Sequence, residues 1–334
     1  MLSITISTAW AQTRERIDAG SVRGAIDRGL TFLARDAVAW KAEHNCSSCH
    51  HAALVVWAMN EAKGRGHAPD DAVLGDLTRW LTEAGEGKTG LKRPAEAPKA
   101  LNTKAVYYAL GLESVTGRSD VEQEALNLLL RTVREDQTEN GSWASWPETR
   151  PPLFGHSDDT VTALATLALM PAAAAGDALA KAAMEQGVGW LEKNETDNDP
   201  QSIAMRLVLW TRLGRPRDEW MPLARRIRDR QRDDGGWSQT AEGSSDAWAT
   251  GQALYALAHA GLPDMEDAIG RGRAFLVKTQ REDGSWPMAS RPQKLGGEGA
   301  DSLIPITGAG SAWAVLGLAR TGFPEMSGKA GHSP

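Results

Sequence analysis

Two kinds of helix-length segment alternate along this sequence. Segments of the first kind are amphipathic, with charged residues on one face and an apolar stripe on the other. Segments of the second kind are apolar nearly all round and rich in Ala, Gly, Ser and Leu, most clearly at residues 159–170, 246–260 and 311–320. A helix that is apolar all round belongs in a protein interior, whereas an amphipathic helix keeps one solvated face. No β-type alternation interrupts the pattern, which therefore predicts an all-α fold with inner and outer helices.

A short motif, Gln-x3-Gly-x-Trp, recurs where amphipathic segments end. It occupies residues 137–143, 231–237 and 280–286. Weaker copies fill the rest of the chain: residues 28–33 match residues 271–276, and residues 80–81 and 190–191 are both Trp-Leu. Internal periodicity of this kind is the signature of a repeat architecture. The spacing predicts six helical hairpins of about fifty residues each, which can close into a ring.

The Gln-x3-Gly-x-Trp motifs resemble the QW repeats of squalene-hopene cyclases and of the related protein prenyltransferases. The resemblance covers residues 21–322 and implies a single α6/α6 toroid domain with an apolar central cavity. It also implies that Trp143, Trp237 and Trp286 brace the outer helices, which is a structural role. Residues 1–11 and 323–334 would then lie outside the toroid, as a remnant signal peptide and a flexible tail.

Composition narrows the classes of function. The chain has 334 residues, 37 of them basic and 43 acidic, and its net charge of −6 without a dense basic block argues against a nucleic-acid-binding protein. No run of about eighteen apolar residues occurs, so a membrane-spanning helix is not expected. The 13 Trp outnumber the 4 Phe and 3 Tyr together, which fits a Trp position that is repeated for structural reasons.

The first residues carry a short export-like pattern. Ala9-Trp10-Ala11 has the small-x-small form of a signal-peptidase site before Gln12, although the apolar stretch ahead of it is short and begins without a basic residue. The pattern predicts an exported protein, periplasmic or secreted, whose true start lies upstream of Met1. The alternative is a frayed N-terminus on a cytoplasmic protein, and two cysteines do not decide between the compartments.

The repeat alignment predicts which residues meet at one opening of the ring. A short polar residue that can cap a helix is expected at the start of each inner segment: Ser48, Asn102, Ser157, Ser202, Ser245 and Ser311. The positions after three of these caps, 49–50, 158–159 and 246, hold Cys, His and Asp. We therefore expect these reactive side chains at equivalent points around one rim.

The first of these positions belongs to a Cys-Ser-Ser-Cys-His-His segment at residues 46–51. Cys-x-x-Cys-His is the attachment signature of c-type haem, in which two thiols bond the haem vinyl groups and the next His ligates the iron. Both cysteines of the chain fall in this motif. The motif predicts haem c bound by Cys46, Cys49 and His50. The alternatives are a disulfide or free dithiol, and a Cys/His zinc site that adds His44 or His51.

The second position lies in residues 155–160, Gly-His-Ser-Asp-Asp-Thr, which resemble the Asp-x-Asp-Asp-Thr acid motif of squalene-hopene cyclases. The resemblance implies a catalytic group in which Asp158 donates a proton, Asp159 is its neighbour and His156 replaces the first Asp. Crowded carboxyl groups in an apolar cavity can retain a proton at neutral pH, because both cannot ionise cheaply. The structural alternative is that Asp158 and Asp246, each after a Ser, only place negative charge at a helix start.

A third constellation combines the rim positions into a metal site. Prenyltransferases of the same superfamily hold zinc with Asp, Cys and His at a toroid mouth. Cys49, His50, Asp158 and Asp246 supply these ligand types, although no Asp-x-Cys match exists.

Two other features are expected to be structural only. His259 lies on an Ala/Leu helix near its C-terminal end and is predicted to be packed or to face the helix dipole. The series Arg225-Arg226-x-Arg228-x-Arg230 is predicted to form a solvated outer face.

Four functions remain open from the sequence. The first is an exported toroid with covalent haem c, working in redox or electron transfer with a redox partner protein, or as a haem enzyme on an apolar small molecule in the cavity. The others are a terpene cyclase-like enzyme with Asp158 as general acid, a zinc-binding prenyltransferase-like toroid, and a non-catalytic toroid whose long loops at 143–155 and 287–310 bind a ligand or protein. The cyclase hypothesis is weakened because squalene-hopene cyclases combine two barrels, and because few Phe and Tyr rings are present to steady carbocations.

Overall fold

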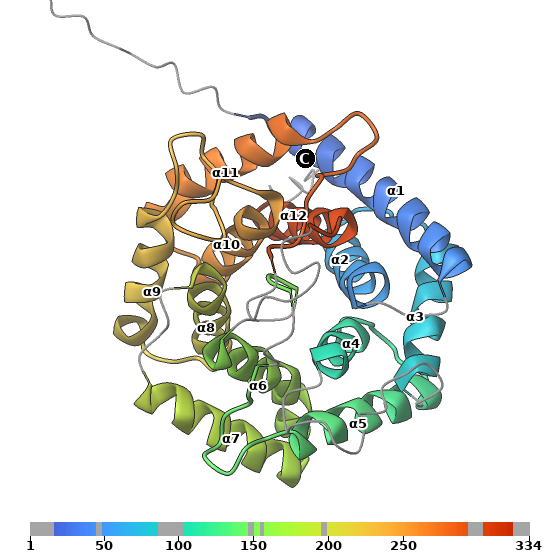
Figure 1. Cartoon of the computed structure of the whole chain (residues 1–334), viewed down its shortest axis with the longest axis vertical. Helices are drawn as coiled ribbons and strands as arrows, with labels where there is room; N and C mark the ends of the chain where they lie inside the picture. Colours follow the sequence, from blue (N-terminus) through green and yellow to red (C-terminus); the bar gives the residue numbers. More distant parts are fainter. Residues whose placement is uncertain are drawn as a thin grey trace, which may run out of the picture.

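The structure, a computed structural model, describes residues 17–44, 49–85, 103–145, 150–153, 157–194, 199–292 and 303–322. In these ranges twelve α-helices form two concentric rings, and no β-strand occurs (Figure 1). The predicted all-α, six-hairpin toroid is therefore confirmed. The expected signal-peptide remnant at 1–11 and the expected tail at 323–334 lie outside the described residues.

Odd-numbered helices make the outer ring and even-numbered helices the inner ring (Figure 1). The outer helices are α1 (Ala19–Glu43), α3 (Asp71–Gly85), α5 (Asp120–Glu135), α7 (Ala178–Lys193), α9 (Arg217–Asp229) and α11 (Glu266–Thr279). The inner helices are α2 (Leu54–Lys63), α4 (Thr103–Glu113), α6 (Asp158–Ala174), α8 (Pro200–Arg212), α10 (Ala247–Ala260) and α12 (Thr307–Thr321). A π-helical turn, Cys49–Ala53, leads into α2, and a 3-10 turn, Pro263–Met265, leads into α11.

Burial follows the two segment types of the sequence. In α10 and α12 nearly every residue is buried, whereas α5 buries one stripe made of Ala125, Leu126, Leu129, Leu130 and Val133. This stripe repeats with the helical period of about 3.6 residues, which leaves the opposite face of α5 to solvent. Among the described helices, none is both long and apolar enough to cross a membrane.

Each Gln-x3-Gly-x-Trp motif joins three helices. The indole N–H of its Trp donates to a carbonyl oxygen on its own outer helix over 2.7–2.8 Å, at Val133, Ile227 and Leu276. The backbone N–H of the Trp donates to a hydroxyl on the paired inner helix over 2.9–3.0 Å, at Thr162, Thr250 and Ser311. The side-chain N–H of its Gln donates to a carbonyl oxygen on the next outer helix over 2.7–2.9 Å, at Ala183, Ala268 and Ala25. The expected bracing role of the three tryptophans is confirmed.

The third motif closes the ring onto the first helix. The Gln280 amide donates to the carbonyl oxygen of Ala25 over 2.9 Å, across 255 residues of sequence. Arg28 in turn donates from Nη2 and Nε to Gln280 Oε1, over 2.6 and 3.1 Å. Gly284 has a φ of 88°, and a Cβ at this position would overlap the carbonyl oxygen of Arg28. The glycine therefore permits the close approach of α1 to the end of α11.

The expected helix caps are only partly correct. Ser157 does cap α6, where its hydroxyl accepts from the N–H of Thr160 over 3.1 Å. In α8 and α10 the caps are Asp199 and Asp246 rather than Ser202 and Ser245. Ser311 lies inside α12, which begins four residues earlier at Thr307. The prediction was wrong there because Ser311 accepts the Trp286 backbone N–H rather than an N–H of its own first turn. Ser48 and Asn102 lie outside the described residues.

The ring closure predicts unequal effects for two Gly→Ala substitutions. Gly176 also has a positive φ, 98°, but a Cβ there would meet nothing within 4 Å. Gly176→Ala should therefore lower the free energy of unfolding by about 1 kcal/mol, the cost of a left-handed conformation. Gly284→Ala adds a backbone overlap and should lower it by roughly 3 kcal/mol or more. Urea denaturation measures both, and equal losses would contradict the assigned closure.

Candidate functional site

The haem-type motif leads directly into the first inner helix. Cys49 begins the π-helical turn, and α2 follows without a break. Cys46 and the side chain of Cys49 lie outside the described residues, so only the histidine of the predicted ligand set is seen with its surroundings. His50 is half-buried and its neighbour His51 is buried.

A cluster of aromatic side chains, Trp40, His44 and His51, lies around His50. Trp40, on α1, stacks on His44 and on His51 with centroid separations of 3.7 and 4.1 Å. The His50 ring is tilted against both, 5.6 Å from Trp40 and 4.3 Å from His51. His51 Nε2 lies 3.3 Å from Asp36 Oδ2, so α1 also holds the neighbouring histidine by an ion pair when it is protonated.

This environment favours the neutral imidazole of His50. Burial lowers the pKa of His50 to about 3, and the adjacent positive charges of His51 and Lys104 act in the same direction. A neutral imidazole is the form that binds a metal ion. A sheltered neutral imidazole that follows two cysteines in the sequence fits a covalently held haem, and it would also fit zinc.

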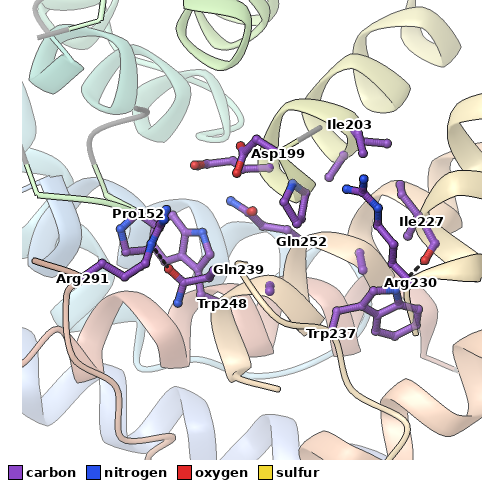
Figure 2. A pocket seen from close by; sticks show the side chains of 15 residues that line it. Pro152, Asp199, Ile203, Ile227, Arg230, Trp237, Gln239, Trp248, Gln252 and Arg291 are labelled. Atoms are coloured by element: carbon purple, nitrogen blue, oxygen red, sulfur yellow. Dashed lines mark hydrogen bonds between the residues drawn. The ribbon is translucent and has the colours of Figure 1, made fainter. Parts of the chain in front are cut away.

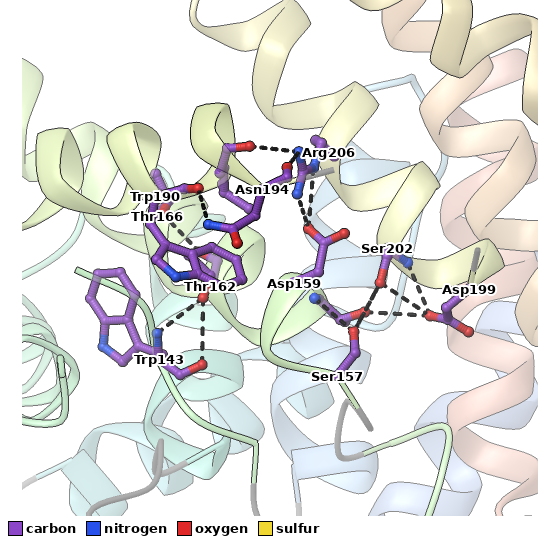
Figure 3. A network of polar contacts seen from close by, with 12 residues as sticks. Trp143, Ser157, Asp159, Thr162, Thr166, Trp190, Asn194, Asp199, Ser202 and Arg206 are labelled. Atoms are coloured by element: carbon purple, nitrogen blue, oxygen red, sulfur yellow. Dashed lines mark hydrogen bonds and ion pairs between the residues drawn. The ribbon is translucent and has the colours of Figure 1, made fainter. Parts of the chain in front are cut away.

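The two neighbouring aspartates of the cyclase-like motif have different environments. Asp158 is exposed at the start of α6 and accepts from the backbone N–H of Ser145 over 2.8 Å. Asp159 is buried, and its Oδ1 accepts from Arg206 Nη2 and Nε over 2.6 and 3.1 Å (Figure 3). His156 lies outside the described residues.

The Asp159–Arg206 ion pair links α6, α7 and α8. Arg206 also donates to the carbonyl oxygens of Leu191 and Asn194, over 2.7 and 3.0 Å. The guanidinium compensates the buried carboxylate, so Asp159 does not crowd Asp158 with a second uncompensated charge. Both aspartates thus have observed structural contacts. The general-acid role of Asp158, with Asp159 and His156 beside it, stays a prediction.

The predicted metal ligands come from separate parts of the ring. His50 and Cys49 precede α2, Asp158 begins α6 and Asp246 caps α10, and Figure 1 shows these helices well separated around the inner ring. In the part of the chain that the structure describes, no group of three or more His, Cys, Asp or Glu side chains is arranged to hold a metal ion. The side chain of Cys49 is not among the described ones.

Asp246 is a half-buried helix cap. Its Oδ1 accepts from the N–H of Ala249 over 2.9 Å, and its Oδ2 accepts from Gln239 Nε2 over 3.0 Å. Burial raises the pKa of this carboxyl above its ordinary value, while these hydrogen bonds act in the opposite direction.

A cavity that sequence reasoning missed lies between the first turns of α8 and α10 (Figure 2). Its polar lining consists of Asp199, Gln201, Arg230, Gln239, Trp248, Gln252 and Arg291. The arginine series 225–230 was expected on a solvated outer face. Arg225 is exposed as predicted, but Arg226 and Arg228 are half-buried, and Arg230, the C-cap of α9, is half-buried and lines this cavity. The missed sequence signal was a glutamine near the start of each of two inner helices, Gln201 in α8 and Gln252 in α10.

A second cavity, of about 320 Å³, lies among the opposite ends of the inner helices. Glu61, Arg212, His259 and Arg320 contribute to its lining. Burial lowers the pKa of His259 to about 3, helped by the three nearby arginines. His259 is only partly buried, and its ring lies 4.9 Å from that of Tyr255, so it is packed in the ring as predicted.

Asp246→Asn should make stability less dependent on pH between about pH 3.8 and neutrality. The raised pKa means that the folded state holds the proton more tightly than the unfolded state, so the contribution of Asp246 to stability is full below about pH 3.8 and falls as pH rises through the folded-state pKa. Asn can keep the cap bond to Ala249, but its amide cannot accept from Gln239 Nε2, which costs stability at every pH. We therefore expect the difference in free energy of unfolding, variant minus wild type, to shift in favour of the variant as pH rises from about 3 to about 7. Urea denaturation at both pH values measures this, and a difference that stays constant or shifts toward wild type would contradict the assignment.

No protein-family model and no curated protein matches this chain. Solved structures do match it. A protein from Actinoplanes has 14% identity and a TM-score of 0.62, covering 91% of this chain and 99% of its own. The type II terpene cyclase MstE from Scytonema has 13% identity and a TM-score of 0.57, with 90% and 98% covered. A glycosyl hydrolase family 88 protein from Bacteroides vulgatus has 9% identity and a TM-score of 0.59, with 91% and 99% covered. At such identities the likeness shows a shared fold, and the chain has the α/α toroid fold found in these proteins.

Proposed function

We propose that this chain is a toroid that carries a covalently attached c-type haem and works in electron transfer with a redox partner protein. The observation that carries the proposal is the Cys-x-x-Cys-His sequence at the start of the first inner helix. The ring of His50 packs there against the rings of Trp40 and His51. When bound, the haem supplies one-electron redox chemistry.

Cys46, Cys49 and His50 have different roles in this proposal. The thiols of Cys46 and Cys49 would hold the haem by thioether bonds to its two vinyl groups. His50 would ligate the iron with a neutral imidazole, whose burial disfavours competing protonation. Trp40 and His51 provide flat ring faces beside His50, and Asp36 orients His51. These neighbours would fix the orientation of the iron ligand.

The proposal places the protein outside the cytoplasm, in the periplasm or secreted. The small-x-small pattern at residues 9–11 supports export. Zinc held by the same cysteines and histidine is the alternative occupant, because thiolate and imidazole are also zinc ligands.

The cyclase hypothesis has less support. The fold likeness to the terpene cyclase MstE favours it, at 13% identity. Proton donation to an alkene requires a carboxyl group that retains its proton in an apolar cavity. The exposure of Asp158 and the Arg206 partner of Asp159 do not supply that environment. The haem proposal needs neither aspartate.

Expression in the periplasm beside a cytochrome c maturation system tests the proposal. The intact mass should rise by one haem, and the pyridine haemochrome spectrum should show thioether-type bands. The double variant Cys46→Ser/Cys49→Ser should lose both signals. His44→Gln, which changes an exposed histidine near the motif, is the matched control and should keep them. An unmodified wild-type mass in a helical, folded protein would contradict haem attachment, and zinc analysis of that sample would test the alternative.

A further inference from the structure

Three buried side chains in the cavity between α8 and α10 have polar atoms without partners among the described residues. They are both amide atoms of Gln201, the indole N–H of Trp248 and the amide N–H of Gln252. The three residues are only 5%, 1% and 2% exposed. Burial of a donor or acceptor without a hydrogen bond costs free energy, and native proteins rarely leave such groups together. Their convergence on one cavity points to a bound molecule.

The cavity is a narrow neck that continues into a wider vestibule. The neck has a volume of about 20 Å³, close to the room that one water molecule needs. The vestibule has about 540 Å³ and shares Asp199, Arg230, Trp237, Gln239 and Arg291 with the neck. Small-molecule sites commonly have this larger size. The head group of a ligand would reach the neck while the rest occupies the vestibule.

The charged lining favours an anion. Arg230, Arg232 and Arg291 line the vestibule, and Asp199 is the one carboxylate among its described lining residues. Burial lowers the pKa of Arg230 and of Arg291, while Asp199 acts in the opposite direction on both. Three cations and one carboxylate around a single vestibule favour a bound anion.

The arginines are held in position before any ligand binds. Arg291 Nε donates to Gln239 Oε1 over 3.1 Å, and Arg232 donates to the carbonyl oxygen of Ala241 over 2.6 Å. Figure 2 shows Gln252 lying between the Arg291 side of the cavity and the Arg230 side. Planar guanidinium groups fixed in this way are suited to carboxylate recognition.

The unpartnered side-chain groups also match hydroxyl groups on a ligand. Gln201 offers both a donor and an acceptor, which matches a hydroxyl group, whereas the indole of Trp248 needs an acceptor. Asp199 in the same lining accepts hydrogen bonds. We infer that the neck and vestibule form a binding site for a small hydroxylated carboxylate, whose acid group is bound by the arginines and whose hydroxyls reach Gln201 and Asp199. This site is separate from the Cys46–His50 motif and does not depend on haem.

Isothermal titration of the full chain with four probes tests the ligand class. D-gluconate carries both features, D-sorbitol lacks the carboxylate, hexanoate lacks the hydroxyls, and inorganic phosphate is an oxyanion alone. Gluconate should bind at one site, at least tenfold tighter than each other probe. Equal binding of sorbitol or hexanoate, tighter binding of phosphate, or no binding of gluconate would overturn the proposal.

Substitution of the unpartnered glutamines separates binding from folding. Gln201→Met and Gln252→Met should each weaken gluconate binding at least tenfold, while the melting temperature without ligand stays equal or rises because an unsatisfied buried group is removed. Gln186→Met, at an exposed position on α7, is the matched control and should change neither. Unchanged binding in both cavity variants, or a fall in melting temperature with binding retained, would overturn the proposal.

A variant of a vestibule residue tests the site even if Gln201→Met and Gln252→Met do not fold. Arg232→Gln should weaken gluconate binding about threefold to tenfold and reduce its salt dependence, since one cation is removed from the anion site. Binding as tight as in wild type, with the same salt dependence, would overturn the assignment of an anion site.

Discussion

The rest of the structure depends on the packing of the sixth hairpin against the first, where α12 lies against α1 and α2 and Gln280 hydrogen-bonds to α1. The hydrogen bond from Gln280 to Ala25 joins residues 255 positions apart. In an open array of repeats, the terminal units would each leave an unpartnered face that needs a cap. Closure removes these faces, and it also positions α1, whose Trp40 and Asp36 form the wall beside His50 and His51. The proposed haem site therefore depends on the same contact that completes the ring.

The inner ring carries two candidate sites, which we propose to have different chemistry. At the start of α2, a Cys-x-x-Cys-His motif meets a cluster of stacked rings on α1. Between the first turns of α8 and α10, buried amides and arginines surround a small neck that opens into a vestibule. Both lie at the N-terminal ends of inner helices. The fold is shared with proteins of unrelated described activities, so the particular side chains must determine what each site binds.

The sequence was sufficient to predict the ring but not its ion pairs and cavities. The helical period and the three Gln-x3-Gly-x-Trp motifs are local signals, and each motif forms the same contacts wherever it occurs. Helix starts were harder, because a serine such as Ser311 can serve a distant backbone N–H instead of its own helix. The Asp159–Arg206 pair joins residues 47 positions apart, and only the packing of α6 against α8 reveals it. Of the haem motif, Cys46 lies outside the described residues, so its prediction rests on the sequence.

Native-state hydrogen exchange on Gln280→Met and Gln137→Met tests the closure most directly. Gln137 donates the same pair of hydrogen bonds, to Gly141 and to Ala183, which is 46 residues away. Gln280 donates to Gly284 and to Ala25, which is 255 residues away, and it also accepts from Arg28 on α1. Loss of the Gln280 side chain therefore removes more of the contact that holds α1. We expect Gln280→Met to lower protection along the whole of α1, whereas Gln137→Met should affect only the adjoining turns of α5 and α7. Protection of α1 equal to wild type in Gln280→Met would contradict it.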